Sequence, residues 1–194
     1  MDFEKILRQY EGELIPHKVY IRISDAESKL RDGLEYFVGH FSSESEAQWI
    51  EKSYRPIVDW MTDNKGRGLL MLGKCGLGKT LIGKHILPLL LRTECGKYVN
   101  VVNAQELNKD IDKLLELKIV YVDDLGTESV SKSYGNVRNT FSELVDAAEQ
   151  QGKLLLVSTN LTTRELADKY GDRTLDRLRA ITKFIPFVGQ SMRR

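Results

Sequence analysis

The residues best suited to chemistry form a glycine-rich stretch that ends in lysine and threonine. Residues 73–80 read Gly-Lys-Cys-Gly-Leu-Gly-Lys-Thr, which is the spacing of a phosphate-binding P-loop. In such a loop Lys79 would reach the β- and γ-phosphates and the Thr80 hydroxyl would bind Mg²⁺. The predicted cradle consists of Gly73, Lys74, Cys75, Gly76, Leu77, Gly78, Lys79 and Thr80. A chance Lys-Thr after a glycine-rich turn is the alternative, but the apolar run before the loop and the helical apolar spacing after it favour the P-loop.

Two consecutive acidic residues form a second candidate site. Asp123 and Asp124 follow the apolar run 119–122, and buried parallel strands carry their ligand-binding residues at this carboxyl end. Asp123 would hold Mg²⁺ together with Thr80, and Asp124 would be the general base for the attacking water. A strand that ends in a hydrated Asp-Asp turn has the same pattern, but the preceding P-loop favours a metal site. Asn160, which follows another apolar run, could contact the γ-phosphate or the water.

A parallel sheet is needed to bring these residues together. The chain contains five apolar runs of strand type, and stretches with apolar residues at helical spacing separate them. The pattern predicts a three-layer α/β P-loop NTPase domain with a parallel sheet of about five strands flanked by helices. Pro186 in the last run predicts a strand that lies at an edge or is locally irregular, and Pro88 is expected to end or bend the helix after the P-loop.

Composition places the chain among ordinary soluble proteins. Hydrophobic residues make up 41% and charged residues 29% of the 194 residues, and the net charge is +1. The first 50 residues are acidic and the last 31 are basic, so the basic end could serve phosphate or nucleic acid. No run is long and apolar enough to predict a membrane span, the start does not read as a secretory signal, and the two cysteines have no metal-binding spacing. We therefore expect a cytoplasmic protein without membrane contact.

The order of motifs resembles one family. Asp-Asp-Leu-Gly stands at 123–126, Ser-Thr-Asn-Leu at 158–161, Gly-Asp-Arg-x-x-x-Arg-Leu at 171–178 and Gly-x-Ser-x-Arg at 189–193. Together with the P-loop they resemble the ATPase core of DnaC-type bacterial helicase loaders and of the related IstB-type transposition helpers, both of the AAA+ superfamily. The resemblance covers residues 44–194.

The resemblance implies further roles for single residues. Asn160 matches the first sensor, and Arg193 matches the second sensor. Arg177 matches the arginine finger that acts on a neighbour's nucleotide, with Arg173 as the second candidate. Asp124 stands where most AAA+ members have glutamate, so hydrolysis is expected to be slow. The predicted catalytic set is Lys79, Asp124, Asn160, Arg177 and Arg193.

The resemblance also implies the cofactors, the strand order and the domains. ATP and Mg²⁺ would be bound, the strands would follow the order 5-1-4-3-2, and no C-terminal helical lid would follow the last strand. Residues 1–43 would form a short N-terminal region that binds a partner, and residues 44–194 would form the AAA+ (ASCE-type) core.

The implied function is an ATP-dependent helicase loader. It would bind single-stranded DNA, with Lys132 and Tyr134 as candidate contacts, load a replicative helicase and self-associate through the Arg177 finger. An IstB-like transposition helper on duplex DNA is the main alternative. A small-molecule P-loop kinase and a module that binds nucleotide without hydrolysing it are the others.

Overall fold

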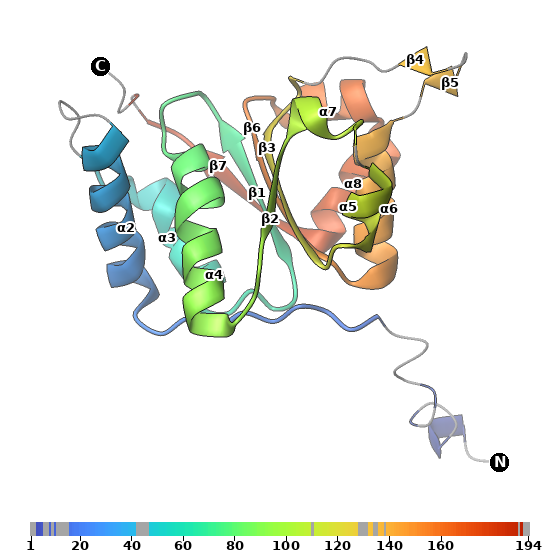
Figure 1. Ribbon diagram of the computed structural model, residues 1–194, viewed down its shortest axis with the longest axis horizontal. Coiled ribbons are helices and arrows are strands. Elements are labelled where there is room, and N and C mark those ends of the chain that lie inside the picture. Colours follow the sequence, from blue (N-terminus) through green and yellow to red (C-terminus); the bar gives the residue numbers. More distant parts are fainter. Residues whose placement is uncertain are drawn as a thin grey trace.

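A five-stranded parallel sheet forms the centre of the protein in the computed structural model (Figure 1). The structure describes residues 3–5, 8, 10, 16–41, 47–109, 111–127, 132–133, 136–137, 139–189 and 191. The strands are β1 (Gly68–Gly73), β2 (Asn100–Asn103), β3 (Ile119–Leu125), β6 (Leu154–Thr159) and β7 (Thr182–Phe187). Their order is β2-β3-β6-β1-β7, and every neighbouring pair is parallel. Counted along the chain this is 5-1-4-3-2 read from the other edge, so the predicted order is confirmed.

The burial of the strands follows their place in the sheet. All six residues of β6 and the first four of β1 are buried, which explains why these segments are continuous apolar runs in the sequence. β7 lies at an edge, as Pro186 predicts, and the proline itself is exposed there.

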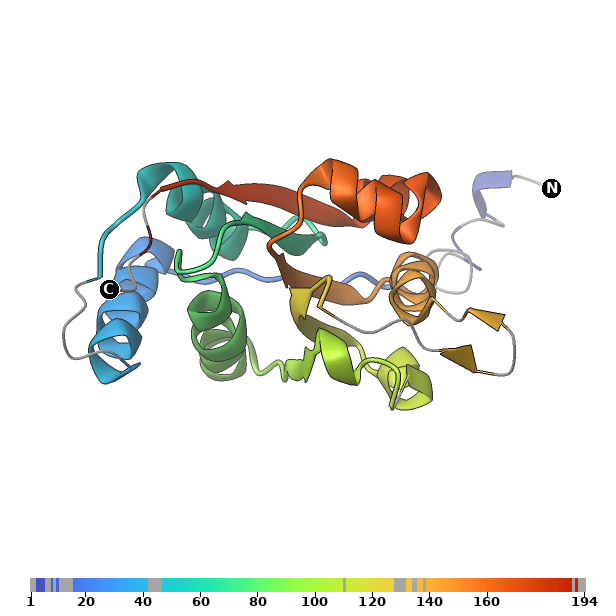
Figure 2. The same ribbon diagram turned by 90° about the horizontal axis from the view of Figure 1, so that it is seen from above.

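Helices cover both faces of the sheet, so the predicted three-layer architecture is confirmed (Figure 2). One face packs against α2 (Ala26–Phe41), α3 (Glu51–Thr62), the π-helix η1 (Leu81–Ile86) and α4 (Leu87–Cys95). The other face packs against α5 (Ile111–Glu116), α6 (Thr140–Gln151), α7 (Thr163–Tyr170) and α8 (Asp172–Ile181). A short 3-10 helix, η2 (Ala104–Glu106), follows β2, and β4 (Lys132–Ser133) pairs with β5 (Asn136–Val137) in a separate antiparallel hairpin.

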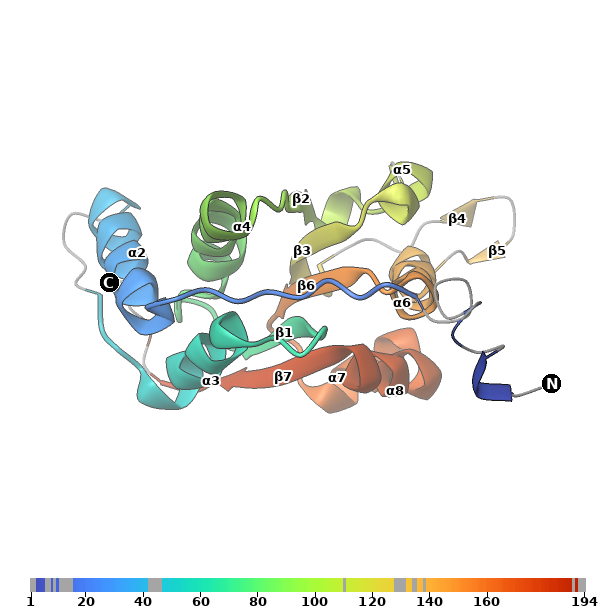
Figure 3. The ribbon, with the colours of Figure 1, turned by 90° about the horizontal axis from the view of Figure 1, so that it is seen from below.

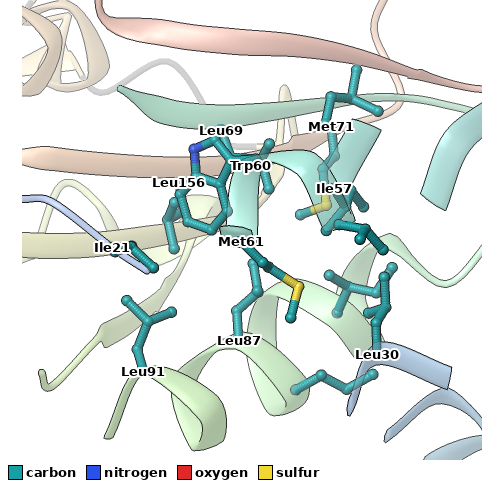
Figure 4. Close-up of a cluster of buried hydrophobic side chains, with 14 of the residues drawn as sticks. Ile21, Leu30, Ile57, Trp60, Met61, Leu69, Met71, Leu87, Leu91 and Leu156 are labelled. Atoms are coloured by element: carbon teal, nitrogen blue, oxygen red, sulfur yellow. The ribbon is translucent and has the colours of Figure 1, made fainter. Parts of the chain in front are cut away.

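Alternate residues of each strand supply the two cores. Leu69, Met71 and Leu156 point into the cluster beneath α2, α3 and α4, where Trp60 and Met61 are fully buried (Figure 4). The residues between them enter the second cluster, beneath α5 to α8. The fold buries both faces of the sheet and leaves the carboxyl ends of the strands to form a site.

The segment before α2, residues 16–23, is an extended arm without a strand partner in the described chain. It runs along the edge where the strands begin, opposite the P-loop (Figure 3). Asn64, which is 3% exposed, holds the arm: its side chain accepts from Ile21 N at 2.9 Å and donates to Val19 O at 2.9 Å. The alternating apolar residues at 18–23 would also fit a short strand, but the structure has an extended arm here.

The predicted N-terminal region contributes to the core. Leu30 and Leu34 of α2 are buried against the helix that follows the P-loop. The expected boundary at residue 43 lies outside the described residues, so the division into 1–43 and 44–194 stays a prediction.

Pro88 lies in the first turn of α4, directly after the π-helical turn. Because proline has no N–H to donate, an ordinary α-helical hydrogen bond is missing at this point. The helix continues through Pro88 after a turn of wider, π-helical geometry. Among the described residues no helix is both long and apolar enough to cross a bilayer.

Candidate nucleotide-binding site

The P-loop connects the end of β1 to the start of the following helix. Gly76 and Gly78 have φ of +81° and +82°, in the left-handed region that glycine adopts without steric cost. This backbone can turn successive N–H groups toward one point, as a polyphosphate requires. The two inner glycines of the predicted loop therefore have a backbone conformation compatible with a phosphate cradle.

Lys79 is held at this loop by three acceptors. Its Nζ donates to Gly73 O at 2.5 Å, to Lys74 O at 2.8 Å and to the Asn160 side-chain oxygen at 3.0 Å. The side chain is only 5% exposed, so its position is well defined. Lys79 and Asn160, two residues of the predicted site that are far apart in the sequence, thus lie together at the carboxyl edge of the sheet.

Thr80 and Asp123, the two predicted metal ligands, also lie close together. The Thr80 hydroxyl lies 3.2 Å from Asp123 Oδ1. A hydroxyl and a carboxylate at this distance supply the hard oxygen ligands that Mg²⁺ prefers, with phosphate oxygens and waters to complete the octahedron. The residues present therefore fit a magnesium nucleotide. Among the described residues no cluster of three or more His, Cys, Asp and Glu side chains offers a metal site of another kind.

Two further side chains, which the sequence interpretation missed, bind the Asp123 carboxylate. Tyr121 donates its hydroxyl to Asp123 Oδ1 at 2.6 Å, and Ser158 donates to the same oxygen at 2.7 Å. Burial, and then the charge of Asp123, raise the pKa of Tyr121 well above its ordinary value, so the hydroxyl keeps its proton and donates. The spacing in the sequence could have indicated the Tyr121 contact, because Tyr121 precedes Asp123 by two residues and therefore lies on the same face of the strand.

Asp124 lies where the strand pairing is interrupted. The register between β3 and β6 shifts between Val122 and Leu125, and Asp124 has a φ of +52°, which is uncommon for a residue with a side chain. Its backbone N–H donates to Ser158 Oγ at 3.1 Å. Asp123 is 6% exposed whereas Asp124 is partly exposed, so the two neighbouring acids have different surroundings.

The predicted arginines differ in their contacts. Arg177, in α8, is 18% exposed and forms ion pairs with Asp146 and, at 3.1 Å, with Glu149 of α6. Arg173, one helical turn earlier, is exposed. Arg193 lies outside the described residues, as do Tyr134 and the side chain of Lys132. The roles of these residues stay predictions.

Comparison with known proteins places this site in a family. The family model described as Novel STAND NTPase 3 matches residues 50–185, which is most of the chain. The chain belongs to this family. No curated protein sequence matches this NTPase significantly.

Solved structures share the fold of this NTPase. The structure of DnaI has a TM-score of 0.55 at 21% identity and covers 88% of this chain and 86% of its own. The DnaC helicase loader has a TM-score of 0.54 at 15% identity, covering 86% and 93%. The replication initiator DnaA bound to AMPPCP and single-stranded DNA has a TM-score of 0.56 at 12% identity, covering 73% and 48%. The predicted likeness to DnaC-type P-loop ATPases is therefore confirmed at the level of the fold.

Proposed function

We propose that this NTPase is a cytoplasmic, ATP-dependent DNA replication protein of the helicase-loader type. The observation that carries the proposal is the convergence of Lys79 with Asn160 and of Thr80 with Asp123 at one edge of the sheet. The printed names of the similar structures, a DnaC helicase loader and a DnaA bound to single-stranded DNA, support a role in replication.

Each residue has a defined task in the proposed hydrolysis. Lys79 holds the phosphate oxygens, and Thr80 and Asp123 hold the magnesium ion, which neutralises charge on the β- and γ-phosphates when it is bound. Asp124 accepts the proton of the attacking water, and Asn160 orients that water or the γ-phosphate. The short side chain of Asp124 sets the base farther back than glutamate would, so turnover is slow.

The first experiment measures ATP binding and hydrolysis separately. Asp124→Asn is expected to keep ATP affinity and to lower turnover by about 10²–10⁴-fold, because it removes a general base and leaves the phosphate cradle intact. Lys79→Ala is expected to lose ATP binding itself. Turnover by Asp124→Asn at the wild-type rate would refute the assignment of the base.

Self-association through an arginine of α8 is the second part of the proposal. Arg177 can reach a neighbour's nucleotide only if it leaves Asp146 and Glu149, whereas Arg173 is already exposed. Hydrolysis by Arg177→Ala and Arg173→Ala is therefore compared, with Arg164→Ala, an exposed arginine of α7, as the control. The variant that lacks the true arginine finger is expected to lose turnover and keep ATP affinity. Full turnover in both Arg177→Ala and Arg173→Ala would refute an arginine finger in α8.

The DNA and helicase partners are tested with the same proteins. Single-stranded DNA is expected to stimulate hydrolysis, and a pull-down with the cognate replicative helicase is expected to depend on ATP. Failure to recover the helicase with or without ATP would refute the loader role. ATP-dependent assembly on duplex DNA without helicase binding would support the transposition-helper alternative instead.

A further inference from the structure

We propose that Tyr121 and Ser158 are positioning residues that fix which oxygen of Asp123 faces the magnesium ion. The inference deepens the proposed function and rests on it, because it concerns the same nucleotide site. It assigns a task to two buried hydroxyl groups that the proposed hydrolysis does not otherwise use.

Three donors converge on a single carboxylate oxygen. Oδ1 of Asp123 accepts from Tyr121 at 2.6 Å, from Ser158 at 2.7 Å and from Thr80 at 3.2 Å. In the described part of the chain Oδ2 receives no hydrogen bond. Each carboxylate oxygen has about two lone-pair sites, so Oδ1 is filled and Oδ2 is the oxygen left for the metal and its waters.

The two shorter bonds are also shielded from solvent. Tyr121 and Ser158 are both 0% exposed, and their two hydroxyl oxygens lie 2.9 Å apart. Hydrogen bonds to an ionised carboxylate are stronger than neutral ones, and water does not compete for buried donors. The carboxylate therefore cannot rotate about its Cβ–Cγ bond without breaking two buried bonds at once.

The ring of Tyr121 is fixed by the helix that follows the P-loop. Gly83 of η1 faces this ring, and a Cβ added at Gly83 would overlap the ring and lie 2.6 Å from the tyrosine hydroxyl. Thr80 and Gly83 belong to the same continuous helical segment, and Tyr121 and Asp123 to the same strand. The tyrosine thus links the helix that supplies one metal ligand to the strand that supplies the other.

A tyrosine in this place could also serve the core alone, so the test needs a readout that core packing does not move. ATP affinity is measured with a fluorescent ATP analogue, first in EDTA and then over a series of Mg²⁺ concentrations. Tyr121→Phe and Ser158→Ala are compared with wild type. Tyr170→Phe is the matched control, because Tyr170 is also buried, at 8% exposure, but lies in the second core cluster.

The expected result is that ATP affinity responds to Mg²⁺ only at higher Mg²⁺ concentrations, while ATP affinity without the metal is unchanged. Tyr121→Phe should need roughly 10-fold more Mg²⁺ for half-maximal enhancement of ATP affinity, as is usual when a group behind a metal ligand is removed. Its affinity in EDTA should stay within about twofold of wild type, and Tyr170→Phe should match wild type in both conditions. If Tyr121→Phe does not fold, Ser158→Ala carries the same test.

The other outcomes separate the two proposals. Wild-type protein whose ATP affinity does not respond to Mg²⁺ would contradict the proposed function. A normal wild-type response that Tyr121→Phe and Ser158→Ala share would overturn only the positioning role. Affinity lost equally in EDTA and in Mg²⁺ would mean a general distortion of the loop and would also overturn it.

Discussion

Replacing Gly83 by alanine tests the packing of Tyr121 against the helix after the P-loop. In most helices this change is favourable, because alanine forms helix better than glycine by about 1 kcal/mol. Gly83 is different because its added methyl group would overlap the Tyr121 ring. We therefore expect Gly83→Ala to destabilise the protein.

The size of the effect follows from what the ring can do. Tyr121 is 0% exposed, and its hydroxyl donates to Asp123 and lies 2.9 Å from Ser158 Oγ, so the ring cannot move aside without losing these contacts. Forcing a methyl group into a filled core costs about 1–3 kcal/mol. Subtracting the gain in helix propensity of about 1 kcal/mol leaves a net loss of up to about 2 kcal/mol, or a few degrees in Tm.

Urea unfolding at pH 7.5 measures the effect, with Gly39→Ala as the matched control. Gly39 is a glycine of α2 whose added Cβ would meet no atom within 4 Å, so this change should stabilise the protein by about 0.5–1 kcal/mol. In a Tyr121→Val background, which removes the ring, Gly83→Ala should no longer destabilise. If Gly83→Ala stabilises wild-type protein as much as Gly39→Ala does, the reasoning about the ring is refuted.

Three further predictions concern the arm, a partly buried histidine and a helix start. Asn64→Ala is expected to destabilise the protein by about 2–3 kcal/mol, because it leaves buried backbone groups of the arm unpaired; hydrogen exchange should show faster exchange at Ile21, and unchanged exchange there would contradict the bond. Burial, and then the charge of Lys84, lower the pKa of His85, so the unfolded chain takes up a proton near pH 6.5 before the folded protein does. Stability should therefore fall as the pH drops below about 6.5, and His85→Gln should flatten that slope in urea unfolding between pH 7 and 5; an unchanged slope would argue against a neutral His85. Thr162→Ala breaks the capping box at the start of α7 and should cost about 1 kcal/mol, measured by thermal unfolding, and an unaltered Tm would show that the cap contributes nothing.

Local patterns in the sequence were sufficient for the phosphate cradle and for much of the sheet. The P-loop is a contiguous segment whose glycines and lysine act within a few residues of each other, so spacing alone predicts it. The central strands are buried on both faces and are therefore continuous apolar runs. Pro186 marks an edge strand because proline cannot donate to a neighbour. The strand order, in contrast, came only from the likeness to a known family.

Contacts between distant segments were decided by the tertiary structure. Tyr121 looked like one more apolar residue of a strand, and only the pairing of β3 with β6 brings Ser158 to the same carboxylate. The alternation in residues 18–23 fits a strand equally well, but the arm crosses the beginnings of the strands, where no parallel partner is available in the described chain. Arg177 reads as a surface residue, yet α6 presents Asp146 and Glu149 to it. In each case the residue type and its local segment can be read from the sequence. The contact partner, however, depends on how the helices and strands pack, and sequence periodicity carries no information about it.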